Sequence, residues 1–340
     1  MRPDMTVRSE PGAGAARPGA KVALLSRIVG GNDRALRRLR EAGVEVVLDL
    51  PGYQALGGDM RRWHAAARGI DALVVGLQPV DRALIDAAPR LRYVLRMGTG
   101  VDNVDLAAAG ERGVRVANLA GMNADAVAEY AFALLLAAAK RVPEADASVR
   151  AGQWRRFTGR HLGGRTLGLV GFGDIGRAMV PMAQGFGMDV LVHRRTPDPE
   201  ADARYGVRTV PLDDLLAGSD FVSLHAPLTE QTKNLIGARE LALMRPGAVF
   251  VNTARGELVD EAALAAALAR GHLGACGLDV FAAEPPGASP LLDLPRVVVS
   301  PHNGAYSDQA VDAMAAAAVD ALLEGLARPA DLPDEQGASA

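Results

Sequence analysis

The feature that most constrains this chain is a repeated alternation of short apolar runs with longer, charged segments of helical length. The runs are continuously apolar instead of alternating apolar with polar residues, so they predict strands that are buried on both faces. Such strands are typical of parallel sheets covered by helical crossovers, and the sequence therefore predicts an α/β protein. The runs form two series, at residues 21–25, 44–48, 71–76, 91–95 and 114–117, and at residues 166–170, 189–193, 221–224, 248–251, 275–278 and 297–300.

The second series has six runs, which is the strand count of a full dinucleotide-binding sheet. A long apolar helix is expected between the two series, opening at about Asn123, and a last helix is expected at about residues 307–325. The chain has 340 residues, which is long enough for two such domains with buried cores.

Charge and aromatic content argue against several kinds of partner. The 37 Lys and Arg residues nearly balance the 40 Asp and Glu residues, so there is no electrostatic reason to expect nucleic acid or an anionic membrane. Aromatic residues make up 4% of the chain, which is few for platforms that stack bases. The longest apolar stretch, residues 130–139, has about half the length that spans a bilayer.

The single cysteine, Cys276, cannot form an intramolecular disulfide, which favours a reducing compartment such as the cytoplasm. It lies in an apolar run, so we expect it in the core and not as a nucleophile. Residues 1–20 are rich in Pro, Gly, Arg and Glu and contain no apolar segment. They predict a disordered N-terminal extension and not a signal peptide.

A glycine motif, Gly171-Phe-Gly-Asp-Ile-Gly176, follows one expected strand and opens an expected helix. In this context Gly171 permits a tight turn, Gly173 lets the backbone approach a pyrophosphate, and Gly176 allows close packing of helix on strand. The helix N-terminus adds unpaired N–H groups and a partial positive charge. The motif predicts a dinucleotide site.

The end of the next expected strand indicates which dinucleotide binds. A site for NAD usually places an acidic residue there, about 20 residues after the motif, to accept hydrogen bonds from the ribose hydroxyls. This chain has Arg194 and Arg195 at that place instead. Guanidinium groups suit a 2′-phosphate, which a carboxylate would repel, so the sequence predicts NADP(H) over NAD(H).

Three polar residues of the second series follow the ends of neighbouring strands. Arg255, Glu284 and His302 each come after an apolar run. Because the carboxyl ends of parallel strands face the ligand crevice of an open α/β sheet, these side chains are expected to converge there.

Together with the glycine motif, these residues resemble the D-isomer-specific 2-hydroxyacid dehydrogenase family. The resemblance covers residues 21–325 and extends to Gly98-Thr-Gly-Val-Asp-Asn103, Gly121-Met-Asn123, Val127-Ala-Glu129, Leu224-His-Ala-Pro-Leu-Thr229 with Thr232, and Leu278-Asp-Val280. It implies two Rossmann-like, doubly wound domains, with a coenzyme domain at 120–304 inserted into a substrate domain at 21–119 and 305–340. It also implies a homodimer and a small anionic 2-keto or 2-hydroxy acid as substrate.

The resemblance assigns a role to each residue of the triad. Arg255 is expected to hold the carboxylate and carbonyl oxygen of the substrate through its guanidinium fork. His302 is expected to donate a proton to the carbonyl oxygen as hydride reaches the carbon, and to remove it in the reverse direction. Glu284 is expected to orient the imidazole and favour its protonated form.

Further contacts are implied for both ligands. Those with the coenzyme are expected at Asp174, Ile175, Ala226, Pro227, Thr232, Thr253, Ala254, Asp279 and Gly304. Those with the substrate are expected at the backbone of Gly98, Thr99 and Gly100, and at Leu77 and Gln78 in the loop after the third strand. No group of Cys, His and Asp residues has metal-ligand spacing, so no metal is expected.

Several functions within the family stay open. Members that oxidise phosphoglycerate often carry arginine in the loop at residues 75–80 to hold the phosphate, and this loop has none. A reductase of glyoxylate or hydroxypyruvate that prefers NADPH is therefore the leading interpretation, and D-3-phosphoglycerate dehydrogenase is the alternative. A corepressor-like protein that binds NAD(H) and protein partners is an alternative of another class. Asn303 stands where apolar residues are common in the family, and nothing in the sequence explains it.

Overall fold

The computed structural model describes residues 19–47 and 60–327. Residues 1–18 of the expected N-terminal extension, Leu48 of the second expected strand, and residues 328–340 lie outside the described part. Residues 19 and 20 are part of the folded chain, since the Gly19 N–H donates to the carbonyl of Gly43 at 3.0 Å and Ala20 is buried.

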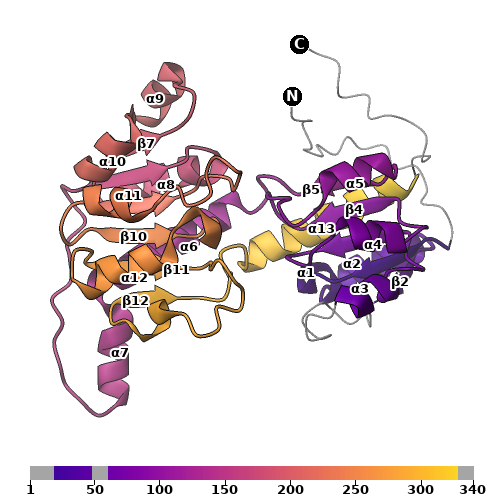
Figure 1. Cartoon of the computed structure of the whole chain (residues 1–340), viewed down its shortest axis with the longest axis horizontal. Coiled ribbons are helices and arrows are strands. Elements are labelled where there is room, and N and C mark those ends of the chain that lie inside the picture. The colour runs from indigo at the N-terminus through magenta and orange to yellow at the C-terminus, as the bar shows by residue number, and fades with distance from the viewer. Residues whose placement is uncertain (1–18, 48–59, 328–340) are drawn as a thin grey trace. The chain divides into compact units, whose positions relative to one another are not determined.

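The chain divides into two compact units, and the second interrupts the first (Figure 1). Unit 1 comprises Met1–Asn123 and Asp308–Ala340, and unit 2 comprises Ala124–Ser307. The sequence places the corresponding divisions at 119/120 and 304/305.

Unit 1 contains a five-stranded parallel sheet with the order β2-β1-β3-β4-β5. This order belongs to the doubly wound folds, in which helices cover both faces of the sheet. Its strands are β1 Lys21–Leu24, β2 Glu45–Val47, β3 Ala72–Val75, β4 Tyr93–Arg96 and β5 Arg115–Asn118. Its helices are α1 Arg27–Gly30, α2 Asp33–Glu41, α3 Met60–Ala66, α4 Arg82–Ala87, α5 Leu106–Glu111 and α13 Asp308–Ala327.

Unit 2 contains a seven-stranded parallel sheet with the order β12-β11-β10-β9-β6-β7-β8. Counted from β6, the order 3-2-1-4-5-6 of the Rossmann fold is present with one strand added beyond it. The strands are β6 Thr166–Val170, β7 Asp189–His193, β8 Arg208–Thr209, β9 Phe221–Leu224, β10 Val249–Asn252, β11 Ala275–Leu278 and β12 Val297–Val299. The expectation of six strands was wrong by one, because β8 has two residues and no apolar run.

Helices cover both faces of the unit 2 sheet (Figure 1). The helices are α6 Ala124–Lys140, α7 Val142–Arg150, α8 Asp174–Gly185, α9 Pro199–Tyr205, α10 Leu212–Gly218, α11 Ala238–Leu243 and α12 Glu261–Ala269. Helices α6 and α8 pack together on one face, and α10, α11 and α12 form a row on the other. All residues of β9, β10 and β11 are buried, as continuous apolar runs between two helical layers require. The fold is thus the α/β class with two doubly wound parallel sheets that the sequence predicts.

The order of the unit 2 sheet places its ligand crevice. Strands β6 and β9 are neighbours although β7 and β8 lie between them in sequence, so the connections from this point run in opposite directions. Open α/β sheets bind ligands outside the carboxyl ends of the strands at such a switch point. The segments that follow β6, β7, β9, β10, β11 and β12 are therefore the ones that build the site.

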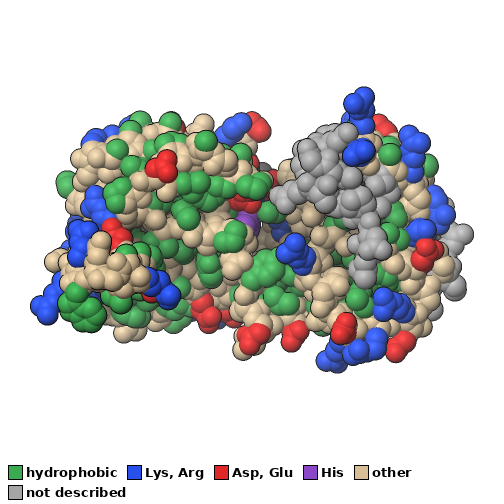
Figure 2. Space-filling model, turned by 90° about the horizontal axis from the view of Figure 1, so that it is seen from below, with side chains coloured by type: hydrophobic (Ala, Val, Ile, Leu, Met, Phe, Trp, Pro, Cys, Tyr) green, Lys and Arg blue, Asp and Glu red, His purple; other side chains and the backbone are tan. Residues whose placement is uncertain are grey.

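The described surface is mixed in charge. Figure 2 shows basic and acidic side chains interspersed over the face that is drawn, consistent with the near balance of charges in the sequence. Within the described ranges, none of the helices has both the length and the apolar character to cross a membrane.

Candidate active site

The turn after β6 brings the glycine motif against the loop that follows β9. Gly171 has a φ of +101°, and a Cβ at this position would lie 2.5 Å from the carbonyl carbon of His225 and 2.7 Å from the nitrogen of Ala226. Only glycine combines this φ with so close an approach of two backbones. The glycine loop therefore lies beside the segment that begins at His225.

The rest of the motif leaves room for an anion. Gly173 is exposed, a Cβ built on it would meet no atom within 4 Å, and it is the N-cap of α8 without a side-chain cap bond. A Cβ on Gly176 would lie 2.6 Å from the carbonyl oxygen of Gly171, so this glycine is needed where helix packs on strand. Asp174 and Ile175 form the first turn of α8. An open, uncapped helix N-terminus behind a tight turn fits the pyrophosphate of a dinucleotide.

Arg194 and Arg195 follow β7, as expected, but their surroundings differ. The side chain of Arg194 is 10% exposed and forms an ion pair with Asp202 of α9. Arg195 is exposed. No carboxylate follows β7 directly, and the nearest acidic groups, Asp198 and Asp202, contact Arg194.

The loop after β9 holds Ala226 and Pro227 next to the glycine motif and is closed by Thr232. The hydroxyl of Thr232 donates to the carbonyl of Pro227 at 2.6 Å and accepts from the Thr229 N–H at 2.8 Å. Thr232 thus stabilises the loop that carries the other two residues.

His225 begins this loop with an enclosed imidazole. Its Nε2 lies 2.9 Å from the hydroxyl of Ser223, and its buried Nδ1 has no hydrogen-bond partner in the part of the chain that the structure describes. Burial lowers the pKa of His225 to about 4. This ring is neutral at physiological pH and lies at the edge of the expected coenzyme site.

The loop after β10 presents Arg255 through a turn that Asn252 closes. The side chain of Asn252 accepts from the Ala254 N–H at 2.9 Å and donates to the carbonyl of Arg255 at 2.8 Å. Thr253 is buried, and its hydroxyl has no hydrogen-bond partner among the described residues, which fits the coenzyme contact expected at this position. Arg255 is half-buried.

Gly256 brings this loop against the segment that follows β11. A Cβ on Gly256 would overlap the backbone of Phe281 and Ala282. Sequence reasoning missed this contact, although a glycine directly after Arg255 was the available signal. The contact places Arg255 and Glu284 on adjoining loops.

Glu284 and His302 form a direct pair. The carboxylate of Glu284 lies 2.8 Å and 3.1 Å from Nδ1 of His302, and both side chains are 27% exposed. His302 has a left-handed backbone with a φ of +56°, and its N–H donates to the carbonyl of Asp279 at 2.8 Å. With Nδ1 engaged by the carboxylate, Nε2 is the ring atom that can exchange a proton with a substrate.

Asp279 holds the loop that carries His302. Its carboxylate is 1% exposed and accepts hydrogen bonds from Ser300 Oγ at 2.6 Å, Asn303 N at 2.7 Å and Gly304 N at 2.8 Å. Sequence reasoning expected Asp279 and Gly304 as coenzyme contacts and missed this bracing role. The backbone of Asn303 is thereby explained, whereas nothing in the structure accounts for its side chain.

In unit 1, the Gly98-Thr-Gly100 turn follows β4. Gly98 has a φ of +119°, which favours glycine, and its carbonyl accepts from the Leu119 N–H at 3.3 Å. The carbonyl of Thr99 accepts from the Asn118 side chain at 2.6 Å. With both carbonyls bonded to the β5 end, the turn is held in a defined shape.

In the loop after β3, Leu77 and Gln78 differ in what their side chains contact. Leu77 is 46% exposed. The Gln78 side chain instead accepts from the Gly76 N–H at 2.8 Å, and Asn103 donates to the carbonyls of Gly76 and Gln78 at 3.0 Å and 2.7 Å. Gln78 therefore shapes the loop with its side chain, and Leu77 is the residue that the loop presents.

A family model for the NAD binding domain of the D-isomer-specific 2-hydroxyacid dehydrogenases matches residues 132–304, which is about half of the chain. The chain belongs to this family. The glycine motif and the residues Arg255, Glu284 and His302 all lie within the matched range. The protein is accordingly an NAD(P)-dependent oxidoreductase that acts on CH–OH donors.

Relatives that carry two different enzyme names support membership in this family. The chain is 45% identical over 258 residues to the glyoxylate reductase of Thermococcus litoralis, covering 73% of this chain and 78% of that protein. It is 46% identical over 259 residues to the D-3-phosphoglycerate dehydrogenase of Mycobacterium bovis, covering 75% of this chain and 49% of that protein, so the match spans about half of the mycobacterial chain.

A solved structure gives the same picture of the fold. An NADPH-dependent glyoxylate/hydroxypyruvate reductase from Sinorhizobium meliloti, in complex with NADP and malonate, superposes with a TM-score of 0.75 at 31% identity. The alignment covers 89% of this chain and 92% of that one.

The single cysteine is poorly placed to act as a nucleophile. The Cys276 thiol is fully enclosed in the core, and burial raises its pKa well above the usual range. Across residues 19–47 and 60–327, no group of three or more His, Cys, Asp or Glu side chains is arranged to hold a metal ion.

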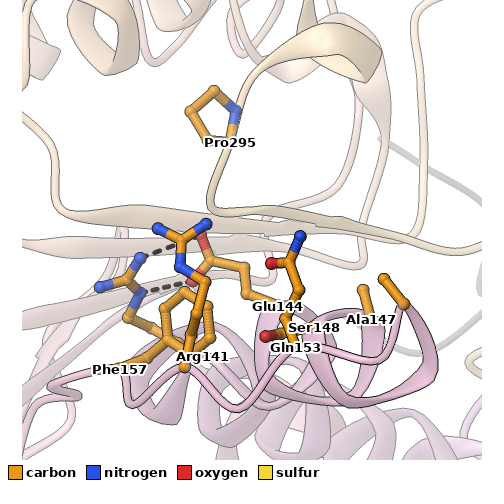
Figure 3. A pocket seen from close by; sticks show the side chains of 9 residues that line it. Arg141, Glu144, Ala147, Ser148, Gln153, Phe157 and Pro295 are labelled. Carbon is orange, nitrogen blue, oxygen red and sulfur yellow. Dashed lines mark hydrogen bonds and ion pairs between the residues drawn. The ribbon is translucent and has the colours of Figure 1, made fainter.

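A hollow of about 460 Å³ lies on unit 2 along α7 (Figure 3). Its lining includes Arg141, Ser148 and Phe157, and none of the expected site residues. Arg141 forms an ion pair with Glu144 and lies 4.8 Å from the ring centre of Phe157. We therefore treat it as separate from the active site.

Proposed function

We propose that this protein reduces small 2-keto acids, such as glyoxylate or hydroxypyruvate, to D-2-hydroxy acids with NADPH. The observation that carries the proposal is the pairing of His302 Nδ1 with Glu284 at 2.8 Å, on loops that adjoin Arg255 and share a sheet edge with the glycine motif. The bound nicotinamide would supply hydride in reduction and accept it in oxidation.

Within this proposal each side chain has one task. Nε2 of His302 donates a proton to the carbonyl oxygen of the keto acid, while Nδ1 stays bonded to Glu284. The fixed carboxylate sets the orientation of the ring for proton transfer. Arg255 binds the carboxylate and carbonyl oxygen of the substrate through its fork of N–H groups. For the Gly98-Thr-Gly100 turn of unit 1, a contact of its backbone with the substrate stays a prediction from the sequence.

Two features support a small substrate without a phosphate. The loop around Leu77 and Gln78 contains no arginine, and the residue that it presents is an apolar leucine. The relative from Thermococcus litoralis is named a glyoxylate reductase. The 46% identity to a D-3-phosphoglycerate dehydrogenase makes phosphoglycerate the second candidate.

The choice of NADPH is supported by charge. Arg194 and Arg195 follow β7 where NAD sites usually place an acidic residue, and a cationic site suits a 2′-phosphate. The reductase from Sinorhizobium meliloti is described as NADPH-dependent and was solved with NADP.

The test is a panel of 2-keto and D-2-hydroxy acids assayed with NADPH, NADH and the oxidised coenzymes. The expected result is the highest kcat/KM for glyoxylate or hydroxypyruvate with NADPH. Highest kcat/KM for 3-phosphoglycerate with NAD⁺ would support the second candidate. Coenzyme binding without turnover of any acid would favour a corepressor-like protein and overturn the proposal.

The proton donor is tested with His302→Gln on the best substrate. Loss of a general acid should lower kcat by about a hundredfold or more. The matched control is His161→Gln, since His161 is exposed in a loop. Retention of kcat by His302→Gln would mean that another group donates the proton.

We also propose that two copies associate through unit 2, in a reducing, cytoplasmic compartment. Helix α7 and the residues after it extend from the body of unit 2 (Figure 1) and expose Val142, Val149 and Trp154 at 55%, 52% and 84%. Apolar groups exposed together on a projecting element are typical of a protein interface. A single buried cysteine, Cys276, agrees with the compartment.

Sedimentation velocity tests the association. The expected species is a dimer, and Val149→Asp should shift it toward monomer because a charge replaces an exposed apolar contact. The control is Arg204→Asp on α9, which also alters an exposed position of unit 2. A monomeric wild type would refute the dimer.

A further inference from the structure

The two arginines after β7 have different surroundings although they are adjacent in sequence. Arg194 has its side chain enclosed, at 10% exposure. Arg195 is exposed, and within the described residues it makes no hydrogen bond or ion pair. Because Nε and Nη2 of Arg194 already donate within the protein, this residue cannot contribute to binding an anion as Arg195 can.

The hydrogen bonds of Arg194 tie together three elements. Its Nε donates to Thr209 Oγ1 of β8 at 3.1 Å, and its Nη2 donates to the Asp198 carbonyl at 2.6 Å and to the Asp202 carboxylate. The carboxylate of Asp202 in turn accepts from Thr209 N at 3.1 Å and Oγ1 at 2.9 Å. The positive charge of Arg194 is therefore matched by a carboxylate within the protein.

The same guanidinium packs on the glycine motif. Its central carbon lies 5.3 Å from the ring centre of Phe172, the residue between Gly171 and Gly173. The Phe172 ring also meets the edge of Tyr205, with ring centres 5.6 Å apart. Arg194 thus holds the side chain of the turn that is expected to approach the pyrophosphate.

We propose that Arg195 binds the 2′-phosphate of the coenzyme, whereas Arg194 is a positioning residue that fixes the glycine turn through Phe172. This inference rests on the proposed preference for NADPH and assigns it to one residue. Asp202 belongs to the same arrangement, because it neutralises Arg194 and keeps it from the phosphate. The glycine turn itself contacts the part of the coenzyme that NAD and NADP share.

Substitutions of Arg195 and of Arg194 should change the affinities for NADP⁺ and NAD⁺ in different ways. Removal of Arg195 deletes a charge-assisted contact to the phosphate, so Arg195→Ala should weaken NADP⁺ binding by roughly 10- to 100-fold and leave NAD⁺ binding nearly unchanged. Removal of Arg194 disturbs the turn, so Arg194→Ala should weaken both coenzymes by a similar factor. Arg194→Lys keeps the charge but loses the fork and should behave like Arg194→Ala.

Dissociation constants for NADP⁺ and NAD⁺ are measured by isothermal titration calorimetry on the full chain, without substrate. The control is Arg270→Ala after α12, which removes an exposed arginine of the same unit and should leave both constants unchanged. Asp202→Asn releases Arg194 and should increase the preference for NADP⁺ several-fold. Thermal midpoints of all variants identify any that do not fold, and Arg194→Lys then replaces Arg194→Ala.

The assignment is overturned if an Arg194 variant, and not Arg195→Ala, lowers the ratio of NADP⁺ to NAD⁺ affinity. It is also overturned if neither arginine changes that ratio. Tighter binding of NAD⁺ than NADP⁺ by the wild type would refute the proposed preference, but the ratio in the variants would still decide which arginine meets the phosphate.

Discussion

Replacement of Asp279 by Asn should reveal how much of the active site depends on one buried carboxylate. The aspartate is 1% exposed and accepts three hydrogen bonds, from Ser300 Oγ, Asn303 N and Gly304 N, at 2.6–2.8 Å. Asparagine has the same shape, but one of its terminal atoms is a donor. That amide group must face a donor of the 300–304 loop, so one bond is lost and a buried N–H or O–H is left without a partner.

The cost follows from these contacts. A hydrogen bond to a charged group contributes about 1.5–3 kcal/mol, and an unpaired buried donor costs about 1–3 kcal/mol, so a loss of about 3 kcal/mol is expected. For a domain of this size 1 kcal/mol changes the thermal midpoint by about 2–4 °C, and Asp279→Asn should lower the midpoint of unit 2 by roughly 6–12 °C. Activity should fall as well, because His302 lies on the loop that is released.

The assay is thermal unfolding followed by circular dichroism, with kcat measured well below the midpoint. Ser300→Ala is the matched control, because it removes one donor and keeps both backbone bonds to the carboxylate. It should lower the free energy of unfolding by about 1.5 kcal/mol, the low end of the range for a hydrogen bond to a charged group, because no donor is left unpaired. An Asp279→Asn protein that melts within 2 °C of the wild type, or no lower than Ser300→Ala, would refute the bracing role.

Two other sites give equally direct tests. Gly256→Ala places a methyl group into the backbone of Phe281, so the loops that carry Arg255 and Glu284 must separate. We expect kcat to fall by roughly a hundredfold or more, as for a misplaced catalytic group. Wild-type kinetics in this variant would contradict the contact. The pKa of His225 is lowered to about 4 in the folded chain, so the unfolded chain binds one more proton between pH 6.5 and 4 and stability must fall as the pH falls through that range. The loss in free energy of unfolding reaches about 3 kcal/mol at pH 4. The urea midpoint of His225→Gln should therefore decline less steeply over this range than that of the wild type. Parallel declines would show that the pKa of His225 is not lowered in the folded chain.

The strands were predictable because burial on both faces requires apolar residues throughout. Each of the eleven expected runs overlaps a strand of the structure. The strand β8, Arg208–Thr209, was missed because a two-residue strand at the sheet edge needs no apolar run. Its partner is β7, and the pairing depends on tertiary contacts that the local sequence does not encode.

The places of the candidate site residues after the strands were predictable, and their contacts were not. Arg255, Glu284 and His302 could be placed at strand ends, and a parallel sheet brings such ends to one edge. Nothing in the sequence shows that Asp279 receives hydrogen bonds from a loop that follows another strand. Such bonds depend on the register of β11 and β12 and on the backbone of the loop.

The two adjacent arginines illustrate the same limit. Arg194 and Arg195 have the same side chain, and the sequence alone therefore predicted the same role for both. The structure separates them because Asp202 and Thr209, from elements later in the chain, both bond to Arg194. Two adjacent arginines in a sequence therefore predict that a ligand is negatively charged. Which of the two binds it depends on which guanidinium already forms an ion pair within the protein.

The structure holds the loop of His302 and the loop of Leu77 by separate sets of hydrogen bonds. In unit 2 His302, the proposed proton donor, is placed by backbone bonds, since Asp279 N donates to the Asn252 carbonyl and His302 N donates to the Asp279 carbonyl. In unit 1 the loop that presents Leu77 is held by its own bonds, from Asn103 and Gln78. Because the two sets share no residue, we expect substitutions at Leu77 to leave the Glu284–His302 pair intact, whatever their effect on the choice of substrate.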